Sequence, residues 1–248
     1  MDAVADWFKW LYAAHGINLT IFYDPLDGNR FLRGIGTTLG LSAICIALSL
    51  VIGIVGAWVQ GARSALLRRL VQGYIQFFRN TPPLIQLYFF YFAVGSLLPR
   101  VTDMHGAQVP PVSNITWAII SFSFFAGAFN VEIFRAGIEA VPRATIEAAE
   151  ALGYSRLKAY IHVVLPLAFR VSLPALNNNL VNLVKTTTLS YAIGVPELLY
   201  AAAQIWSEVL NVREMMNVLL ISYVAIVGAL VLVMNRWERA MRMPGYGV

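Results

Sequence analysis

The sequence predicts an all-α integral membrane protein with five transmembrane helices, and three observations support that fold class. The chain of 248 residues is 58% hydrophobic and only 12% charged, whereas soluble domains carry roughly 25% charged residues. It contains several apolar stretches of the length that a helix needs to cross a bilayer, about 20 residues. Its Lys and Arg residues gather at the ends of those stretches, as they do in membrane proteins.

The N-terminal segment, residues 1–33, is predicted to lie outside the membrane or at its interface. Five residues favour a short aromatic helix at the membrane–water boundary: Trp7, Phe8, Trp10, Leu11 and Tyr12. The segment begins acidic and has no uninterrupted apolar stretch of the length found in secretory signal peptides. We therefore expect it to anchor the chain rather than to be removed.

Residues 34–248 are predicted to form one transmembrane domain. The second of its spans is the least regular, because Pro82 and Pro83 should break or kink that helix near its cytoplasmic end. The five predicted spans are residues 35–60, 74–98, 115–134, 171–193 and 215–234.

The distribution of positive charge predicts the orientation of these spans. Of the 18 Lys and Arg residues, five lie in segments between or before the spans that we place outside: Lys9, Arg30, Arg33, Arg100 and Arg213. Lys185 lies within a span, and the other twelve fall in segments that we place inside. By the positive-inside rule the N-terminus is outside and the C-terminus is cytoplasmic. The same distribution explains the basic character of the chain without nucleic-acid binding.

Residues 147–166, here called the knuckle, are predicted to form two short helices between the third and fourth spans. Gly153 can end the first helix in a left-handed conformation, and Ser155 can cap the second. Pro166 is expected to stop the second helix. Its apolar stripe is Leu157, Tyr160, Ile161, Val164 and Leu165. A capped helix pair with one apolar stripe indicates a surface that binds a partner.

The fourth span is unusually polar for a transmembrane helix. Asn178, Asn182 and Lys185 are spaced i, i+4 and i+7, so they share one face, with Asn179 and Thr186 close by. A Lys at the centre of a membrane helix costs roughly 2.5–3.5 kcal/mol, so this face should not meet lipid. We interpret it as part of a water-filled pathway for a polar solute. The alternative is a hydrogen-bonded network that joins neighbouring helices.

The chain carries no sequence signature of an enzyme. It has no phosphate-binding loop, no Gly-x-Ser-x-Gly nucleophile motif and no His-Glu-x-x-His zinc motif. Its three His residues are scattered, and the single Cys45 excludes an internal disulfide. Glu132 and Arg135 are expected to form a structural pair rather than a proton relay. We therefore predict no catalytic residue, no metal and no cofactor bound by this chain.

The knuckle resembles the EAA loop of permease subunits of ABC importers. The family pattern appears as Glu147-Ala148-Ala149, then Gly153, then Val163-x-Leu165-Pro166, with Val163 where the family has Ile. Four further stretches resemble the polar amino-acid branch of that family: residues 33–39, 78–87, 182–189 and 193–198. Together the resemblance covers about residues 30 to 245.

The resemblance implies a type I ABC permease fold in the bacterial inner membrane, with the N-terminal segment in the periplasm. It implies a pore made with a second, identical or homologous permease, two ATPase subunits that bind ATP and Mg, and a soluble substrate-binding protein. The coupling loop, about residues 136–166, would contact the ATPase through Glu147, Ala148, Ala149, Gly153, Tyr154, Val163, Leu165 and Pro166. The cargo would be a polar amino acid, and the candidate pathway residues are Asn178, Asn179, Asn182, Lys185, Thr186, Arg79 and Thr81.

Other functions remain as alternatives. The same importer class also carries other small polar solutes, such as opines or compatible solutes. An ATP-independent channel or carrier would need an intramembrane acid relay or an internal repeat, and neither is clear in the sequence. A membrane scaffold or insertion factor would leave the polar fourth span unexplained.

Overall fold

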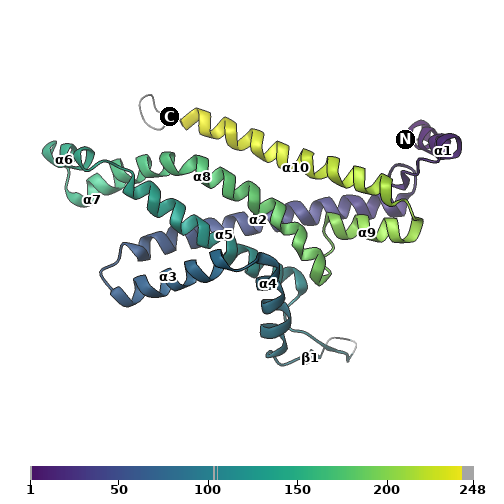
Figure 1. The fold of residues 1–248 in the computed structure, drawn as a ribbon, viewed down its shortest axis with the longest axis horizontal. Coiled ribbons are helices and arrows are strands. Elements are labelled where there is room, and N and C mark those ends of the chain that lie inside the picture. Colours follow the sequence, from purple (N-terminus) through teal and green to yellow (C-terminus); the bar gives the residue numbers. More distant parts are fainter. Residues whose placement is uncertain (1, 103, 105, 242–248) are drawn as a thin grey trace. The chain divides into compact units, whose positions relative to one another are not determined.

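The structure is a computed structural model that describes residues 2–102, 104 and 106–241. Figure 1 shows that the described chain is almost entirely helical, as the sequence predicts. The chain divides into two compact units. The first comprises Met1–Ile44, Leu87–Ile119 and Val184–Gly228, and the second comprises Cys45–Gln86, Ile120–Leu183 and Ala229–Val248.

Four helices of the described residues are long and apolar enough to cross a membrane. They are α2 (Pro25–Gln60), α5 (Asn114–Glu139), a composite helix (Arg156–Ile193) and α10 (Val212–Met241). They contain the first, third, fourth and fifth predicted spans. The prediction of an all-α membrane fold is confirmed.

The second predicted span is divided in the structure. Helix α3 (Ala65–Asn80) ends before the two prolines, and α4 (Pro83–Tyr88) continues into the π-helical turn η2 (Phe89–Val94). The break at Pro82 and Pro83 is therefore where the sequence placed it. The first part begins at Ala65, about two turns earlier than the predicted start at residue 74, because Ser64 accepts a hydrogen bond from the Leu67 N–H and caps the helix there.

The remaining elements are short. In sequence, helix α6 (Arg143–Ala151) lies between α5 and the composite helix. The composite helix consists of α7 (Arg156–Ala159), the π-helical turn η3 (Tyr160–Val164), α8 (Leu165–Thr186) and the 3-10 segment η4 (Thr187–Ile193). Strands β1 (Val101–Thr102) and β2 (Gln108–Val109) form an antiparallel pair. The others are α1 (Asp2–His15), the 3-10 turn η1 (Thr20–Phe22) and α9 (Leu198–Val209).

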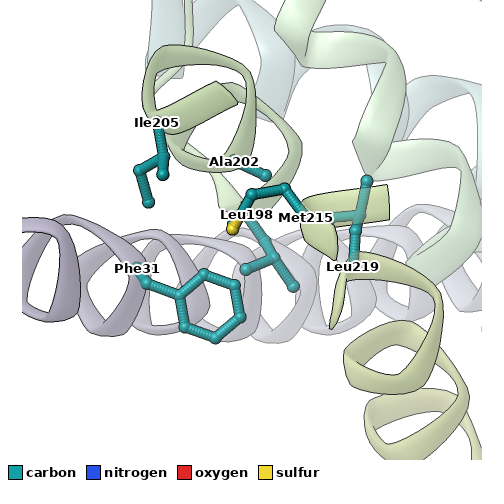
Figure 2. Close-up of a cluster of buried hydrophobic side chains, with 6 residues drawn as sticks. All are labelled: Phe31, Leu198, Ala202, Ile205, Met215 and Leu219. Carbon is teal, nitrogen blue, oxygen red and sulfur yellow. The ribbon is translucent and has the colours of Figure 1, made fainter. Parts of the chain in front are cut away.

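The core of the first unit joins α2, α9 and α10. Figure 2 shows Phe31 of α2 among Leu198, Ala202 and Ile205 of α9 and Met215 and Leu219 of α10. Gly34 permits this packing, because a Cβ at that position would lie 2.8 Å from the Cβ of Ala201. The absence of a side chain on α2 therefore lets α9 approach its backbone closely.

A buried carboxylate holds the start of α9. Glu197 is fully buried and accepts hydrogen bonds from the Leu199 and Tyr200 N–H groups, both at 2.9 Å, and from the Tyr223 hydroxyl at 2.8 Å. Burial raises the pKa of the Glu197 carboxyl, and these three hydrogen bonds oppose that rise. Thr38 of α2 accepts from the Leu198 N–H at 3.0 Å. The network thus joins α9 to α2 and α10.

We expect Glu197→Ala to lower the free energy of unfolding by roughly 2–4 kcal/mol, because it removes a helix cap and leaves the Tyr223 hydroxyl without this acceptor. The matched control is Glu208→Ala, whose side chain is 52% exposed and pairs with Arg30 at 2.6 Å. That change should cost at most about 1 kcal/mol. Unfolding of the purified chain in detergent measures both, and equal losses in the two variants would contradict a stabilising role for the buried carboxylate.

Two apolar clusters lie among the described residues of the second unit. In the larger one, Leu176 and Leu180 of α8 pack with Met234 of α10. In the smaller one, Val164 and Ala168 of the composite helix pack with Val141, which follows α5. The smaller cluster fixes the base of the knuckle to the membrane helices.

Candidate functional site

The knuckle forms as its local sequence signals predict. Helix α6 ends at Ala151, and Gly153 has a φ of +88°. The Gly153 N–H donates to the Glu150 carbonyl at 2.9 Å, and the Tyr154 N–H donates to the Ala149 carbonyl at 3.1 Å, so the last carbonyls of α6 are satisfied. Ser155 then accepts from the Lys158 N–H at 3.4 Å and begins α7. The predicted left-handed turn and cap are both confirmed.

The prediction that Pro166 stops the second helix is wrong. The composite helix runs from Arg156 through Pro166 into α8 without interruption. Directly before the proline, the Leu165 N–H bonds to the Tyr160 carbonyl, five residues back, which is the pattern of a π-helical turn. This wider turn makes room where a proline ring would otherwise clash with the preceding turn of an α-helix.

Large apolar side chains on the knuckle are left uncovered. Val164 is buried in the smaller cluster, which separates it from the rest of the predicted stripe. Leu152 is 81% exposed and Leu157 is 69% exposed. The other exposed members are Tyr154, Tyr160, Ile161 and Leu165. Uncovered apolar side chains of this size indicate a contact surface for another protein.

The predicted coupling residues divide into an exposed and a covered set. Ala149 is buried and Val163 is half-buried, so they are less available to a partner than the others. The exposed residues of the set are Glu147, Ala148, Gly153, Tyr154, Leu165 and Pro166. A groove of about 350 Å³ lies between the two helices, and Glu147, Ile146 and Tyr160 are among the residues that line it. The exposed set and this groove lie on the same two short helices of the knuckle.

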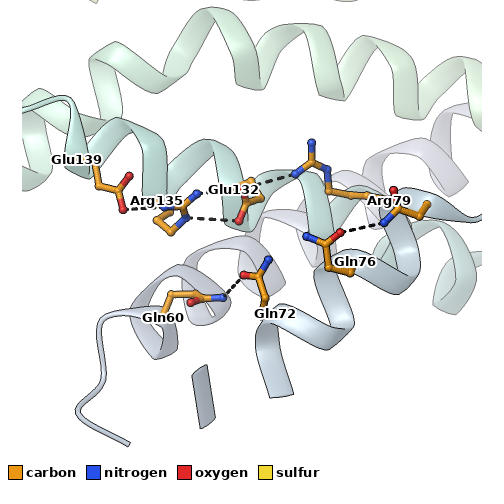
Figure 3. A network of polar contacts seen from close by, with 8 residues as sticks. Gln60, Gln72, Gln76, Arg79, Glu132, Arg135 and Glu139 are labelled. Carbon is orange, nitrogen blue, oxygen red and sulfur yellow. Dashed lines mark hydrogen bonds and ion pairs between the residues drawn. The ribbon is translucent and has the colours of Figure 1, made fainter. Parts of the chain in front are cut away.

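Charged residues of α3 and α5 form a connected network (Figure 3). Glu132 pairs with Arg135 at 3.1 Å and with Arg79 at 3.5 Å, and Arg135 also pairs with Glu139 at 2.7 Å. The Arg79 guanidinium lies over the Phe129 ring, 5.3 Å from its centroid. The structural pairing expected of Glu132 and Arg135 is present, and Arg79, a candidate pathway residue, takes part in it.

The asparagines of α8 point in two directions. Asn178, Asn182 and Lys185 lie on its exposed side and are here called the polar face of α8, with Thr186 half-buried beside them. Asn179 is buried and donates to the Ala126 carbonyl at 3.1 Å and to the Asn130 side chain at 2.8 Å. Neighbouring residues of a helix point about 100° apart, so one helix supplies both an exposed polar face and contacts that join helices.

Thr81 serves the break between α3 and α4. Its hydroxyl donates to the Phe77 carbonyl at 2.7 Å and accepts from the Gln86 amide at 2.5 Å. Gln86 is 2% exposed and also donates to the Phe78 carbonyl at 2.9 Å. Pro82 has no N–H to donate to the Phe78 carbonyl four residues before it, and the Gln86 amide donates to that carbonyl instead. The geometry of Thr81, which binds Gln86, is therefore that of a structural residue.

Sequence reasoning missed several buried polar residues, among them Gln86 after the two prolines, Asn130 in the third span and Glu197 before α9. Asn130 links α5 to α2, because its amide donates to the Ser49 hydroxyl at 3.2 Å. The available signal was a polar residue inside an otherwise apolar stretch, the same signal that drew attention to α8.

Comparison with known proteins places these features in a family. Residues 49–242 match the family described as binding-protein-dependent transport system inner membrane component. The chain is 28% identical to the probable amino-acid permease protein YxeN of Bacillus subtilis (strain 168), over 86% of this chain and 92% of that protein. It is 30% identical to the glutamate/aspartate import permease protein GltJ of Escherichia coli (strain K12), over 82% and 86%.

The fold is also similar to that of a chain in the crystal structure of an amino acid ABC transporter with histidines. The two share 25% identity with a TM-score of 0.75, and the match covers 86% of this chain and 94% of the other. The EAA-like knuckle, the apolar helices and the family match agree. The chain belongs to the family of inner membrane components of binding-protein-dependent transport systems.

Proposed function

We propose that this chain is a permease subunit that imports a polar amino acid across the bacterial inner membrane. The observation that carries the proposal is the knuckle, where a fixed helix pair leaves Leu152 and Leu157 more than two-thirds exposed. Because the knuckle continues directly into the composite helix, movement at the docking surface would move a membrane helix as a rigid body. The partner at this surface is a subunit that hydrolyses ATP with Mg; this chain binds neither.

The polar face of α8 is the reason to propose a second permease subunit. Asn178, Asn182 and Lys185 are exposed on a helix of membrane-spanning length, where contact with lipid is unfavourable. A second permease subunit, identical or homologous, would cover this face and enclose a polar pathway. A substrate-binding protein would deliver the solute from the outer side, and two ATPase subunits would drive the cycle. In this arrangement the chain has five spans with its N-terminus outside.

The proposed cargo, a polar amino acid, rests on the chemistry of the α8 side chains and on the similarity of the chain to named permeases. Amide groups and an ammonium group can hydrogen-bond and neutralise the carboxylate of an amino acid, and several relatives are named as amino-acid permeases. The N-terminal segment 1–33 would lie at the outer surface of the inner membrane, since α1 exposes Trp7 and Trp10.

The direct test is uptake into proteoliposomes that contain the chain with its partner permease and ATPase. Labelled amino acids are offered one at a time with the binding protein, with and without ATP. We expect uptake of a polar amino acid that requires both ATP and the binding protein. Uptake without ATP would favour a carrier instead, and ATP-dependent uptake of only another polar solute would correct the cargo.

A further inference from the structure

An apolar groove lies behind the knuckle, within the second unit. It has a volume of about 370 Å³ and is lined by side chains of α2, α5 and the composite helix, among them Ile54, Trp58, Phe134, Leu165 and Phe169. Two lining residues carry a hydroxyl, Tyr160 and Ser172, and that of Ser172 already donates to the Ala168 carbonyl at 2.8 Å. The lining of the groove therefore favours an apolar ligand.

A second hollow of about 470 Å³ adjoins the groove, because Ala57, Trp58, Ile138 and Tyr160 line both. It differs in chemistry. Its wall includes Gln60 at the end of α2 and two charged residues of α5, Arg135 and Glu139. The lining of the two hollows together changes from mostly apolar to charged within about one to two turns of α2, between Ile54 and Gln60.

Two tryptophans mark this level as a membrane–water boundary. Trp58 is 76% exposed near the end of α2, and Trp237 near the end of α10 is 44% exposed. Trp237 packs edge-to-face on Phe169 of the groove, with ring centroids 5.9 Å apart. Tryptophan is enriched where lipid headgroups meet hydrocarbon. The apolar groove thus lies on the hydrocarbon side and the charged hollow on the headgroup side.

The charged hollow matches a headgroup that carries both signs of charge. Arg135 and Glu139 form an ion pair of 2.7 Å, and their side chains are 38% and 62% exposed. A guanidinium has five N–H donors, so Arg135 can bind a phosphate while it keeps its bonds to Glu132 and Glu139. The second carboxylate oxygen of Glu139 can accept from a primary ammonium.

We propose that the groove binds one phospholipid of the adjoining leaflet, with an acyl chain in the apolar part and a phosphoethanolamine headgroup at Arg135 and Glu139. Phosphatidylcholine lacks the N–H donors for Glu139, and phosphatidylglycerol lacks the positive charge. The lipid lies against Tyr160 and Leu165, at the π-helical turn of the composite helix. The exposed apolar side chains of the knuckle that remain for the protein partner are then Leu152, Tyr154, Leu157 and Ile161. It is a ligand distinct from the transported solute and from the ATPase.

The test compares three lipids with identical acyl chains on the purified full chain in detergent by native mass spectrometry. The chain should retain one phosphatidylethanolamine about fivefold better than phosphatidylcholine or phosphatidylglycerol, the factor expected of one exposed ion pair. Glu139→Gln should bring phosphatidylethanolamine down to the level of phosphatidylcholine. The matched control is Asp6→Asn, an exposed carboxylate that pairs with Lys9 on α1, and it should keep the preference.

Two further variants test the acyl-chain part. Ala57→Phe fills the wall shared by both hollows, and Ile54→Trp narrows the groove from a position that is 59% exposed and therefore tolerant of a larger side chain. Both should reduce retention of all three lipids, and the unfolding midpoint of Ile54→Trp verifies that the chain is folded. Equal retention of the three lipids by the unaltered chain, or unchanged retention in Ile54→Trp, would overturn the proposal. So would cross-linking of Trp58→Cys between two copies of the chain, since the groove would then be a subunit interface.

Discussion

The Gly153→Asp variant is expected to insert normally but to lose the stimulation of ATP hydrolysis by the loaded binding protein. A Cβ at Gly153 would meet no atom within 4 Å, so the change creates no clash within the chain and adds roughly 1–2 kcal/mol of local backbone strain. It places a carboxylate between the exposed side chains of Leu152 and Tyr154. Burial of an unpaired charge under the ATPase would be costly.

The measurement is the ATPase rate in proteoliposomes with and without loaded binding protein. Gly16→Asp is the matched control, since Gly16 follows α1 with a φ of +70° and also has no atom within 4 Å of an added Cβ. The Gly16→Asp variant introduces the same backbone strain and the same charge at a position far along the chain from the knuckle. The stimulation of ATP hydrolysis by loaded binding protein should therefore persist in it. Full stimulation in Gly153→Asp would mean that the knuckle does not couple ATP hydrolysis to transport.

Leucine at both Asn178 and Asn182 is expected to reduce uptake by about 5-fold to 150-fold, because two amide groups that would hydrogen-bond the solute are lost, each contributing about 0.5–1.5 kcal/mol. The amount of folded chain should stay the same, since both side chains lie on the exposed side of α8. Initial rates of binding-protein-dependent uptake measure the effect, with the yield of complex measured in parallel.

Two variants of the same helix separate transport from assembly. Ala175→Leu adds bulk on the exposed side of α8 without removing a polar group, and it should transport nearly normally. Asn179→Leu removes buried bonds to Ala126 and Asn130, so it should lower the yield of folded protein. Normal uptake in the double leucine variant would assign the polar face of α8 to helix contacts alone.

The features that the sequence predicted correctly depend on few neighbouring residues. Gly153 and Ser155 set the turn and the cap of the knuckle through bonds within five positions along the chain. The break at Pro82 follows from the missing N–H of proline in the same local way. The helical period also predicted which of the α8 asparagines would share a face, although not which of them would be buried.

The features that were missed depend on distant parts of the chain. Glu197 is bound by Tyr223, which is 26 positions away, and Thr38 bonds to Leu198 across 160 positions. The passage of the helix through Pro166 depends on the placement of a π-helical turn, which leaves no clear mark in the hydrophobic pattern. The break in the second span was predicted, but the role of Gln86 in holding its two parts was not, because its buried bonds form only after the chain is folded.

The π-helical turn η3 has a consequence for the angular phase of the composite helix. A π-helical turn holds one residue more than an α-helical turn, and one residue of an α-helix corresponds to about 100° of rotation. Leu157 precedes η3 and Asn178 follows it. The extra residue therefore sets the azimuth of the exposed leucine relative to the exposed asparagine. Deletion of one residue from η3 would rotate the knuckle by about 100° about the axis of the composite helix relative to the polar face of α8. The side chains of the knuckle and of that polar face would themselves be unchanged.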